Sequence, residues 1–180
     1  TQQIRDVDWL KNRYFFIHPW FRNGIDTAVV HNLLIHQINI PSFYPLRNGL
    51  HYIGNLVVKN FELYKSINTN DAGAVTGTAY INPLNPLDSA YTDDNETGNF
   101  IRLESGTNYV LSADLGYIRL RDMVMNEILG CSFVLEDRNT GDTVLVVGSP
   151  ADSAGTNLSL MMLKPRNSHP NHSTWPLMFK

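Results

Sequence analysis

The sequence predicts an all-β protein, an antiparallel β-sandwich with one or two short helices and long loops, for which a jelly roll is one arrangement. First, residues 99–148 alternate short β-rich segments with tight, glycine-bearing turns. Second, apolar side chains in these segments recur with a period of two, which is typical of strands that bury one face. Third, 180 residues, 43% of them hydrophobic, suffice for one substantial core. Such strands bury their apolar faces by pairing two sheets, and an eight-stranded barrel is the alternative.

Two different elements fit the sequence near the N-terminus. Asp6 or Asp8 would cap a short helix that runs to Tyr14. The Tyr-Phe-Phe-Ile run of residues 14–17 reads equally well as a strand. Pro19 ends either element, because proline has no backbone N–H to continue its hydrogen bonding.

The two longest β-rich runs follow, over residues 27–40 and 55–67. Two prolines and an Asn-Gly pair predict a loop over residues 41–49 between them. In the second run, one face carries Lys59 and Lys65 as well as apolar side chains, so its burial pattern is only partly clean. The apolar residues of that face are Val57, Phe61, Leu63 and Ile67.

Residues 68–99 are the least regular part of the chain, with one short strand predicted at 78–81. Long loops in compact domains are often binding or contact elements. The acidic stretch Asp88–Glu96 offers the carboxylate and amide oxygens that calcium takes, without the ordered spacing of an EF-hand loop. A solvated turn is the alternative interpretation of this stretch.

The next part of the chain predicts short strands joined by tight turns, at residues 100–104, 109–113 and 117–122. In the third of these, Ile118 and Leu120 point to one face of the sheet. The opposite face carries Tyr117, Arg119 and Arg121. One face of the sheet is therefore expected to be buried here and the other to face solvent.

Residues 122–130 are predicted as the second short helix. Asp122 is placed at its N-cap and Gly130 at the C′ position. Val124 and Ile128 would lie on one side of this helix, where they could both be buried.

A β-hairpin is predicted over residues 133–147, because two β-rich runs flank a turn whose Asn139 and Gly141 tolerate a positive φ. A last strand is predicted at 158–163. The chain is therefore divided into one β-sandwich domain, residues 1–165, which includes an N-terminal aromatic segment, and a C-terminal tail or arm, residues 166–180.

Charge and hydropathy exclude two classes of partner. The formal net charge is −3, and no run of Lys and Arg follows the spacing of a phosphate backbone. We therefore expect no nucleic acid partner. No apolar run reaches the roughly 18 residues that a membrane span needs, so we expect no membrane span.

The sequence contains no motif of a known catalyst. None of the six histidines has a His, Asp or Glu two residues further on, the spacing that places two metal ligands on one face of a strand. Cys131 is interpreted as a small buried hydrophobic residue. Neither a Gly-x-Ser-x-Gly elbow nor a glycine-rich phosphate loop occurs. We expect no enzyme activity, no catalytic residue, no cofactor and no metal.

Aromatic residues near the termini and in a proline-bounded loop carry the remaining functional signal. Terminal aromatics typically anchor an arm into the protein's own core or into a neighbouring subunit. Exposed aromatics on a sandwich can also stack on sugar rings. The predicted subunit contacts are Trp9, Trp20, Phe21, Phe43, Tyr44, Trp175 and Phe179.

In general architecture, the chain resembles the small jelly-roll coat proteins of viruses, whose sandwiches tile through loops and terminal arms. The resemblance implies a non-enzymatic structural subunit that self-assembles, as a coat protein in a virion or in a similar assembly at an extracellular surface. Its partners would be copies of itself and other structural proteins of the same assembly. A carbohydrate-binding or adhesive module, with a glycan as its partner, is the alternative.

Overall fold

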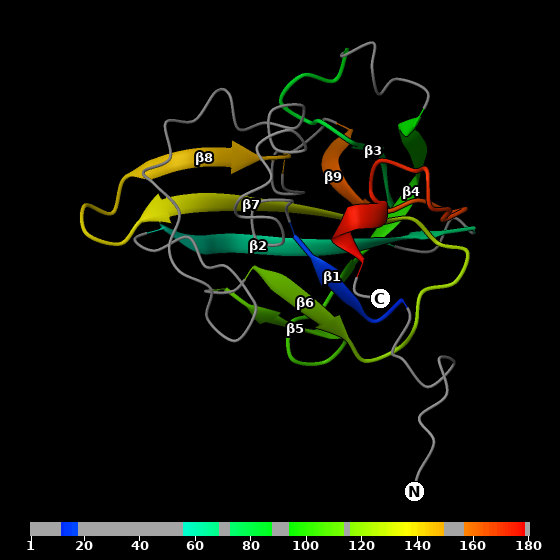
Figure 1. The fold of residues 1–180 in the computed structure, drawn as a ribbon, viewed down its shortest axis with the longest axis horizontal. Coiled ribbons are helices and arrows are strands. Elements are labelled where there is room, and N and C mark those ends of the chain that lie inside the picture. Colours follow the sequence, from blue (N-terminus) through cyan, green and yellow to red (C-terminus); the bar gives the residue numbers. More distant parts are fainter. Residues whose placement is uncertain are drawn as a thin grey trace, which may run out of the picture.

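A computed structural model describes residues 12–17, 56–68, 73–87, 94–113, 116–149 and 157–178. Within these ranges the chain is an all-β sandwich, in which a three-stranded sheet packs against a six-stranded sheet (Figure 1). The predicted fold class is therefore confirmed. The strand predicted at 27–40 and the loop at 41–49 lie outside the described residues. So do six predicted contact residues: Trp9, Trp20, Phe21, Phe43, Tyr44 and Phe179.

The three-stranded sheet has the order β1-β6-β5, and both pairs are antiparallel. Its strands are β1 (Tyr14–Phe16), β5 (Tyr109–Ser112) and β6 (Tyr117–Leu120). Of the two elements that fit the N-terminal sequence, the strand is the one that forms at residues 14–16. The alternation predicted for β6 is confirmed, because Ile118 and Leu120 are buried while Arg119 is exposed.

The six-stranded sheet has the order β2-β4-β3-β9-β7-β8. Its strands are β2 (Leu56–Ile67), β3 (Val75–Tyr80), β4 (Glu96–Leu103), β7 (Leu129–Asp137), β8 (Thr143–Val147) and β9 (Leu158–Lys164). The predicted hairpin is confirmed, since β7 and β8 pair antiparallel. Gly141 in its turn has a φ of 74°, which glycine adopts without steric cost.

An additional pairing between β2 and β7 closes five strands of this sheet into a ring, β2-β4-β3-β9-β7. The strand β8 extends outward from β7 beyond the ring. One pair, β3 with β9, is parallel, and this sets the described connectivity apart from a jelly roll of antiparallel strands. Because the three-stranded sheet packs outside the ring, these strands do not form a single eight-stranded barrel either.

Two hydrophobic clusters lie on opposite faces of the same strands. In β9, Met161 and Leu163 belong to the cluster between the two sheets, whereas Leu160 and Met162 belong to a cluster inside the ring. The ring is tight where β3 and β9 meet. A Cβ atom added to Gly77 would lie 2.5 Å from the Cβ atom of Leu158, so only glycine fits this approach of the two backbones.

The strand β2 confirms the run predicted at 55–67, but its side chains do not follow one simple alternation. Its pairing with β7 shifts between Lys59 and Glu62, where β2 carries one extra residue, and Asn60 adopts a φ of 48°. Beyond this bulge Leu63 and Tyr64 are both buried, one in each hydrophobic cluster. The strand is therefore covered on both faces.

The helix predicted over residues 122–130 is wrong. This segment is irregular up to the start of β7 at Leu129, and Gly130 is a strand residue. The carboxylate of Glu127 accepts hydrogen bonds from the backbone N–H groups of Met125 and Asn126. In the predicted helix, the N–H of Asn126 would instead donate to the backbone carbonyl four residues earlier. Val124 and Ile128 are buried, as the spacing suggested, but in separate clusters.

The helix of the described chain is a single 3-10 turn, Trp175–Leu177, that leads to a buried Met178. An isolated bridge joins Met178 to Phe15 of β1, so the end of the described chain lies beside the three-stranded sheet (Figure 1). Among the residues described, no helix is long and apolar enough to cross a lipid bilayer.

Candidate functional site

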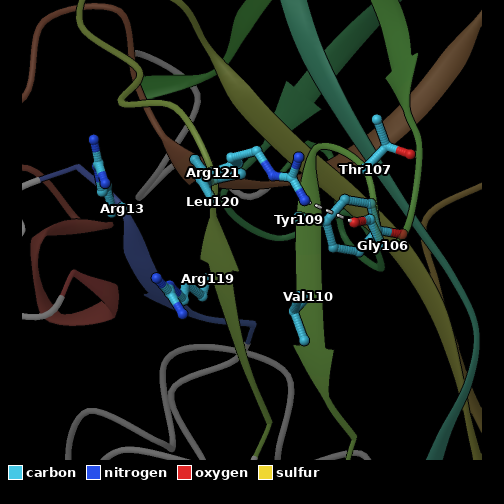
Figure 2. Close-up of a pocket in the computed structure, with 8 residues that line it drawn as sticks. All are labelled: Arg13, Gly106, Thr107, Tyr109, Val110, Arg119, Leu120 and Arg121. Atoms are coloured by element: carbon cyan, nitrogen blue, oxygen red, sulfur yellow. Dashed lines mark hydrogen bonds between the residues drawn. The ribbon is translucent and has the colours of Figure 1, made fainter.

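A hollow of about 270 Å³ opens on the three-stranded sheet, and three arginines lie around it. We call it the arginine groove (Figure 2). Arg119 lies in β6, and Arg121 directly follows the end of this strand. Arg13 directly precedes β1. The remaining lining residues are Gly106, Thr107, Tyr109, Val110 and Leu120.

Strand pairing places these arginines together. Arg119 pairs with Tyr14 on one side and with Val110 on the other, so it stands in the middle of the sheet. The guanidinium carbon of Arg119 lies 6.0 Å from the centre of the Tyr14 ring, which is within the range of a cation–π contact. The backbone N–H of Leu120 donates to the carbonyl of Arg13 at 2.7 Å, and this bond fixes Arg13 beside the end of β6.

The positive charge of the groove has no carboxylate partner within the described chain. Ion pairs occupy two other arginines, Arg102 with Glu62 at 2.9 Å and Arg166 with Glu96 at 3.8 Å. In the groove, Arg121 donates only a long 3.4 Å hydrogen bond to the carbonyl of Gly106. The Nε atom of Arg13 is buried and has no hydrogen-bond partner among the described residues.

A second hollow of about 460 Å³ lies on the other side of Tyr109, between Phe61 and Arg102. Its arginine is paired within the protein, because Glu62 binds Arg102 and also accepts a hydrogen bond from the Tyr64 hydroxyl, so the remaining charged group of its lining is Glu104. Burial raises the pKa of Tyr109, so its phenol stays protonated. The second hollow therefore offers a ligand fewer free charged groups than the arginine groove.

Exposed apolar side chains form another candidate surface on β8. Val144 and Val146 are 39% and 47% exposed, and Val144 is an extra residue in the pairing of β8 with β7. In the described sheet β8 is the terminal strand, with β7 on one side (Figure 1). The five residues of β8 include neither a charged residue nor a proline.

The C-terminal segment packs against its own chain. Of the predicted contact residues, Trp175 is the one that the structure describes, and it lies half-buried against the cluster between the two sheets. Leu177 and Met178 are buried in the same cluster. The described part of residues 166–180 is thus anchored in the sandwich.

The carboxylates at the end of the acidic stretch 88–96 bind this C-terminal segment. The hydroxyl of Ser173 donates to Asp94 at 3.0 Å, and the backbone N–H of Arg166 donates to Glu96 at 2.9 Å. Residues 88–93 lie outside the described part, so neither the calcium hypothesis nor the solvated turn is tested there. Within the ranges that the structure covers, no cluster of three or more His, Cys, Asp or Glu side chains could hold a metal ion.

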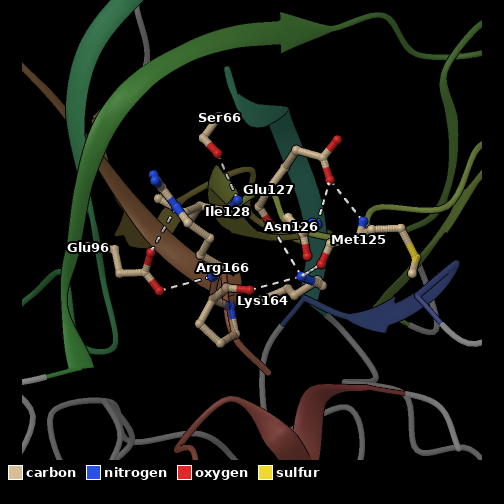
Figure 3. Close-up of polar contacts among 9 residues, drawn as sticks. Ser66, Glu96, Met125, Asn126, Glu127, Ile128, Lys164 and Arg166 are labelled. Carbon is tan, nitrogen blue, oxygen red and sulfur yellow. Dashed lines mark hydrogen bonds and ion pairs between the residues drawn. The ribbon is translucent and has the colours of Figure 1, made fainter. Parts of the chain in front are cut away.

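Lys164 is buried, and its amino group is surrounded by backbone carbonyl groups (Figure 3). Its amino group donates hydrogen bonds to the carbonyls of Met125, Glu127 and Pro165, at 2.9, 3.2 and 2.9 Å. Burial lowers the pKa of Lys164, while the nearby carboxylates of Glu127 and Glu96 oppose this shift. Since every donor of the ammonium group has an acceptor, Lys164 holds the irregular segment before β7 in place.

Cys131 is buried in β7, as its interpretation as a small hydrophobic residue predicted. Burial raises the pKa of its thiol, so the reactive thiolate form is disfavoured.

Neither the models of protein families nor the curated proteins give a match to this chain. The candidate site therefore rests on geometry alone. Sequence reasoning missed the arginine groove, because it searched for consecutive runs of basic residues. The position of Arg119 and Arg121 on the solvent-facing side of a predicted strand could have indicated the groove. Nothing in the sequence indicated that Arg13 lies near them.

Proposed function

We propose that the chain is a non-enzymatic structural subunit that self-assembles, as a viral coat protein or as part of a similar assembly. Its partners are copies of itself and other structural proteins, and its place is a virion or an extracellular surface. The observation that carries this proposal is the exposed apolar face of β8 at the end of the six-stranded sheet.

A terminal strand can extend its sheet by pairing with a strand from another chain. Proteins that remain monomeric usually protect such strands with charged residues, prolines or bulges. The outer strand β8 carries no charged residue and no proline, and it exposes Val144 and Val146; its one irregularity is an extra residue at Val144 in the pairing with β7. A pairing between copies would bury these side chains and add backbone hydrogen bonds, and repeated modest contacts of this kind hold a lattice together by avidity.

The first test is the mass in solution, measured by size-exclusion chromatography with light scattering over a range of protein concentrations. We expect a species well above 20.4 kDa whose fraction rises with concentration. A 20.4 kDa monomer at every concentration would show that the proposal is wrong.

The variant Val146→Lys tests the role of β8 directly. A lysine on this face opposes strand addition, so half-assembly should need a protein concentration roughly tenfold higher, the equivalent of about 1.4 kcal/mol. Met123→Lys is the matched control, because Met123 is an apolar, 51% exposed residue outside the strands. Assembly of Val146→Lys at the concentration of the unmodified protein would remove β8 from the interface.

A carbohydrate-binding or adhesive module is the second candidate function, and the arginine groove favours it. Its guanidinium groups offer hydrogen-bond donors beside apolar surface from Val110 and Leu120, a combination that suits a sugar ring. Screening of neutral and charged glycans against the monomer tests this candidate. Binding of a glycan at the groove by a protein that stays monomeric would favour it over assembly.

A further inference from the structure

We infer that the arginine groove binds an oxyanion group, a sulfate or phosphate carried by an acidic small ligand. This inference does not depend on assembly, because the groove lies on the three-stranded sheet and β8 belongs to the other sheet. It rests on the charge, the hydrogen-bond donors and the size of the groove.

The charge of the groove selects for an anion. Arginine stays protonated under all ordinary conditions, and its planar fork of donors matches the spacing of oxygens in sulfate and phosphate groups. Arg13, Arg119 and Arg121 bring three such groups to one hollow in a chain whose formal net charge is −3. This local concentration of positive charge opposes the sign of the whole molecule.

The donors of the groove are incompletely used. The buried Nε atom of Arg13 has no acceptor in the described structure, and a buried donor without a partner is costly. Arg121 reaches the carbonyl of Gly106 only at 3.4 Å. An oxyanion in the groove would supply acceptors to the exposed guanidinium groups of Arg119 and Arg121, which have no carboxylate partner in the described structure.

The size and walls of the groove limit the ligand. The volume of the groove, about 270 Å³, is slightly smaller than that of typical small-molecule sites, which measure about 300–1,000 Å³. The groove therefore suits a charged group attached to a small molecule. Val110, which is 59% exposed, and Leu120 give that body an apolar wall. An extended nucleic acid would need a longer row of cations than three arginines in one hollow.

Calorimetric titration with inorganic phosphate, inorganic sulfate and a sulfated disaccharide tests the inference. We expect the disaccharide to bind, and inorganic sulfate or phosphate to displace it. Binding should weaken as the salt concentration rises, because the contact is between charges. Equal binding of the same disaccharide without its sulfate groups would overturn the inference, and it would favour recognition of the sugar itself.

Substitutions locate the binding. Arg119→Gln and Arg121→Gln should each raise the dissociation constant about tenfold, since each removes charge-assisted hydrogen bonds. Arg119→Lys keeps the charge but loses the planar fork, so it should lie between these variants and the unmodified protein. Arg138→Gln, in the exposed turn between β7 and β8, is the control for a change of net charge.

Arg119 and Arg121 are exposed, so their variants should retain the melting temperature of the unmodified protein, which circular dichroism measures. An affinity of folded Arg119→Gln and Arg121→Gln equal to that of the unmodified protein would overturn the inference. So would an equal loss of affinity in Arg138→Gln, because binding would then follow net charge alone.

Discussion

Two paired glycines, Gly77 in β3 and Gly98 in β4, differ in the space around them although they lie directly opposite each other. A Cβ atom on Gly77 would meet the Cβ atom of Leu158 at 2.5 Å and its carbonyl oxygen at 2.8 Å. A Cβ atom on Gly98 would meet nothing closer than 3.8 Å. The pair therefore separates the cost of steric crowding from the general effect of replacing a strand glycine.

We predict that Gly77→Ala lowers the free energy of unfolding by about 2–3 kcal/mol, because β3 and β9 must move apart to admit the methyl group. Gly98→Ala should be neutral or stabilising by about 0.5–1 kcal/mol, since alanine loses less conformational entropy on folding. Urea denaturation of both variants provides the measurement. Equal destabilisation by the two substitutions would contradict the close approach of β3 and β9.

At the scale of elements, the C-terminal segment after β9 is held by polar contacts to the residues just before β4. His172 is buried there, and its Nδ1 atom accepts hydrogen bonds from the backbone N–H of Thr174 at 3.2 Å and from its hydroxyl at 2.9 Å. An accepting Nδ1 requires a neutral ring. The charged groups that face it are Asp94 and Glu96, which favour protonation, and His169, which opposes it.

Burial lowers the pKa of His172 below its usual value, so the unfolded chain binds a proton more readily than the folded one. Stability from the neutral ring is therefore complete above the unfolded pKa of about 6.5, and it is lost as the pH falls through that value toward the lower folded pKa. We predict that the free energy of unfolding falls between pH 7.5 and pH 5, and that His172→Gln reduces this fall. Urea denaturation at both pH values measures it, with Asn171→Gln, at an exposed position of the same segment that does not titrate, as the control. The prediction fails if the unmodified protein and His172→Gln show the same dependence on pH.

Elements whose side-chain pattern is local were predictable from the sequence. The strand β6 shows this, because Ile118 and Leu120 alternate with exposed neighbours, and so does the hairpin around Gly141. The segment 122–130 was mispredicted for the opposite reason. Its carbonyls are bound by Lys164, which is distant in sequence, and no local spacing reveals such a partner.

The candidate site was predictable only in part, for the same physical reason. The sequence placed Arg119 and Arg121 on one face of a strand, but Arg13 joins them only through the pairing of β1 with β6. The sequence also left open whether the aromatic residues after residue 165 anchor into the protein's own core or into a neighbouring subunit. A stretch with several prolines and polar residues resembles a free tail until the contacts of Leu177 and Met178 with the core are known.

At the scale of the whole molecule, these C-terminal contacts connect folding with assembly. Leu177 and Met178 fill the space between the two sheets, and burial of each is worth roughly 1.5–3 kcal/mol. Their sum is a large share of the 5–15 kcal/mol that typically stabilises a domain. Removal of residues 166–180 would therefore weaken the subunit itself, and a loss of assembly in that variant would not identify the tail as an interface.

We predict that deletion of residues 166–180 lowers the melting temperature of the monomer. The single substitution Leu177→Ala should lower the free energy of unfolding by about 2–4 kcal/mol, because the smaller side chain leaves a cavity in the core. Asn171→Ala, at an exposed position of the same segment, should change it by less than about 0.5 kcal/mol. Circular dichroism melts and urea denaturation at concentrations where the protein is monomeric measure these effects. An unchanged melting temperature after the deletion would contradict an anchored segment. In that case residues 166–180 would be free to act as an arm, and their loss would become a valid test of assembly.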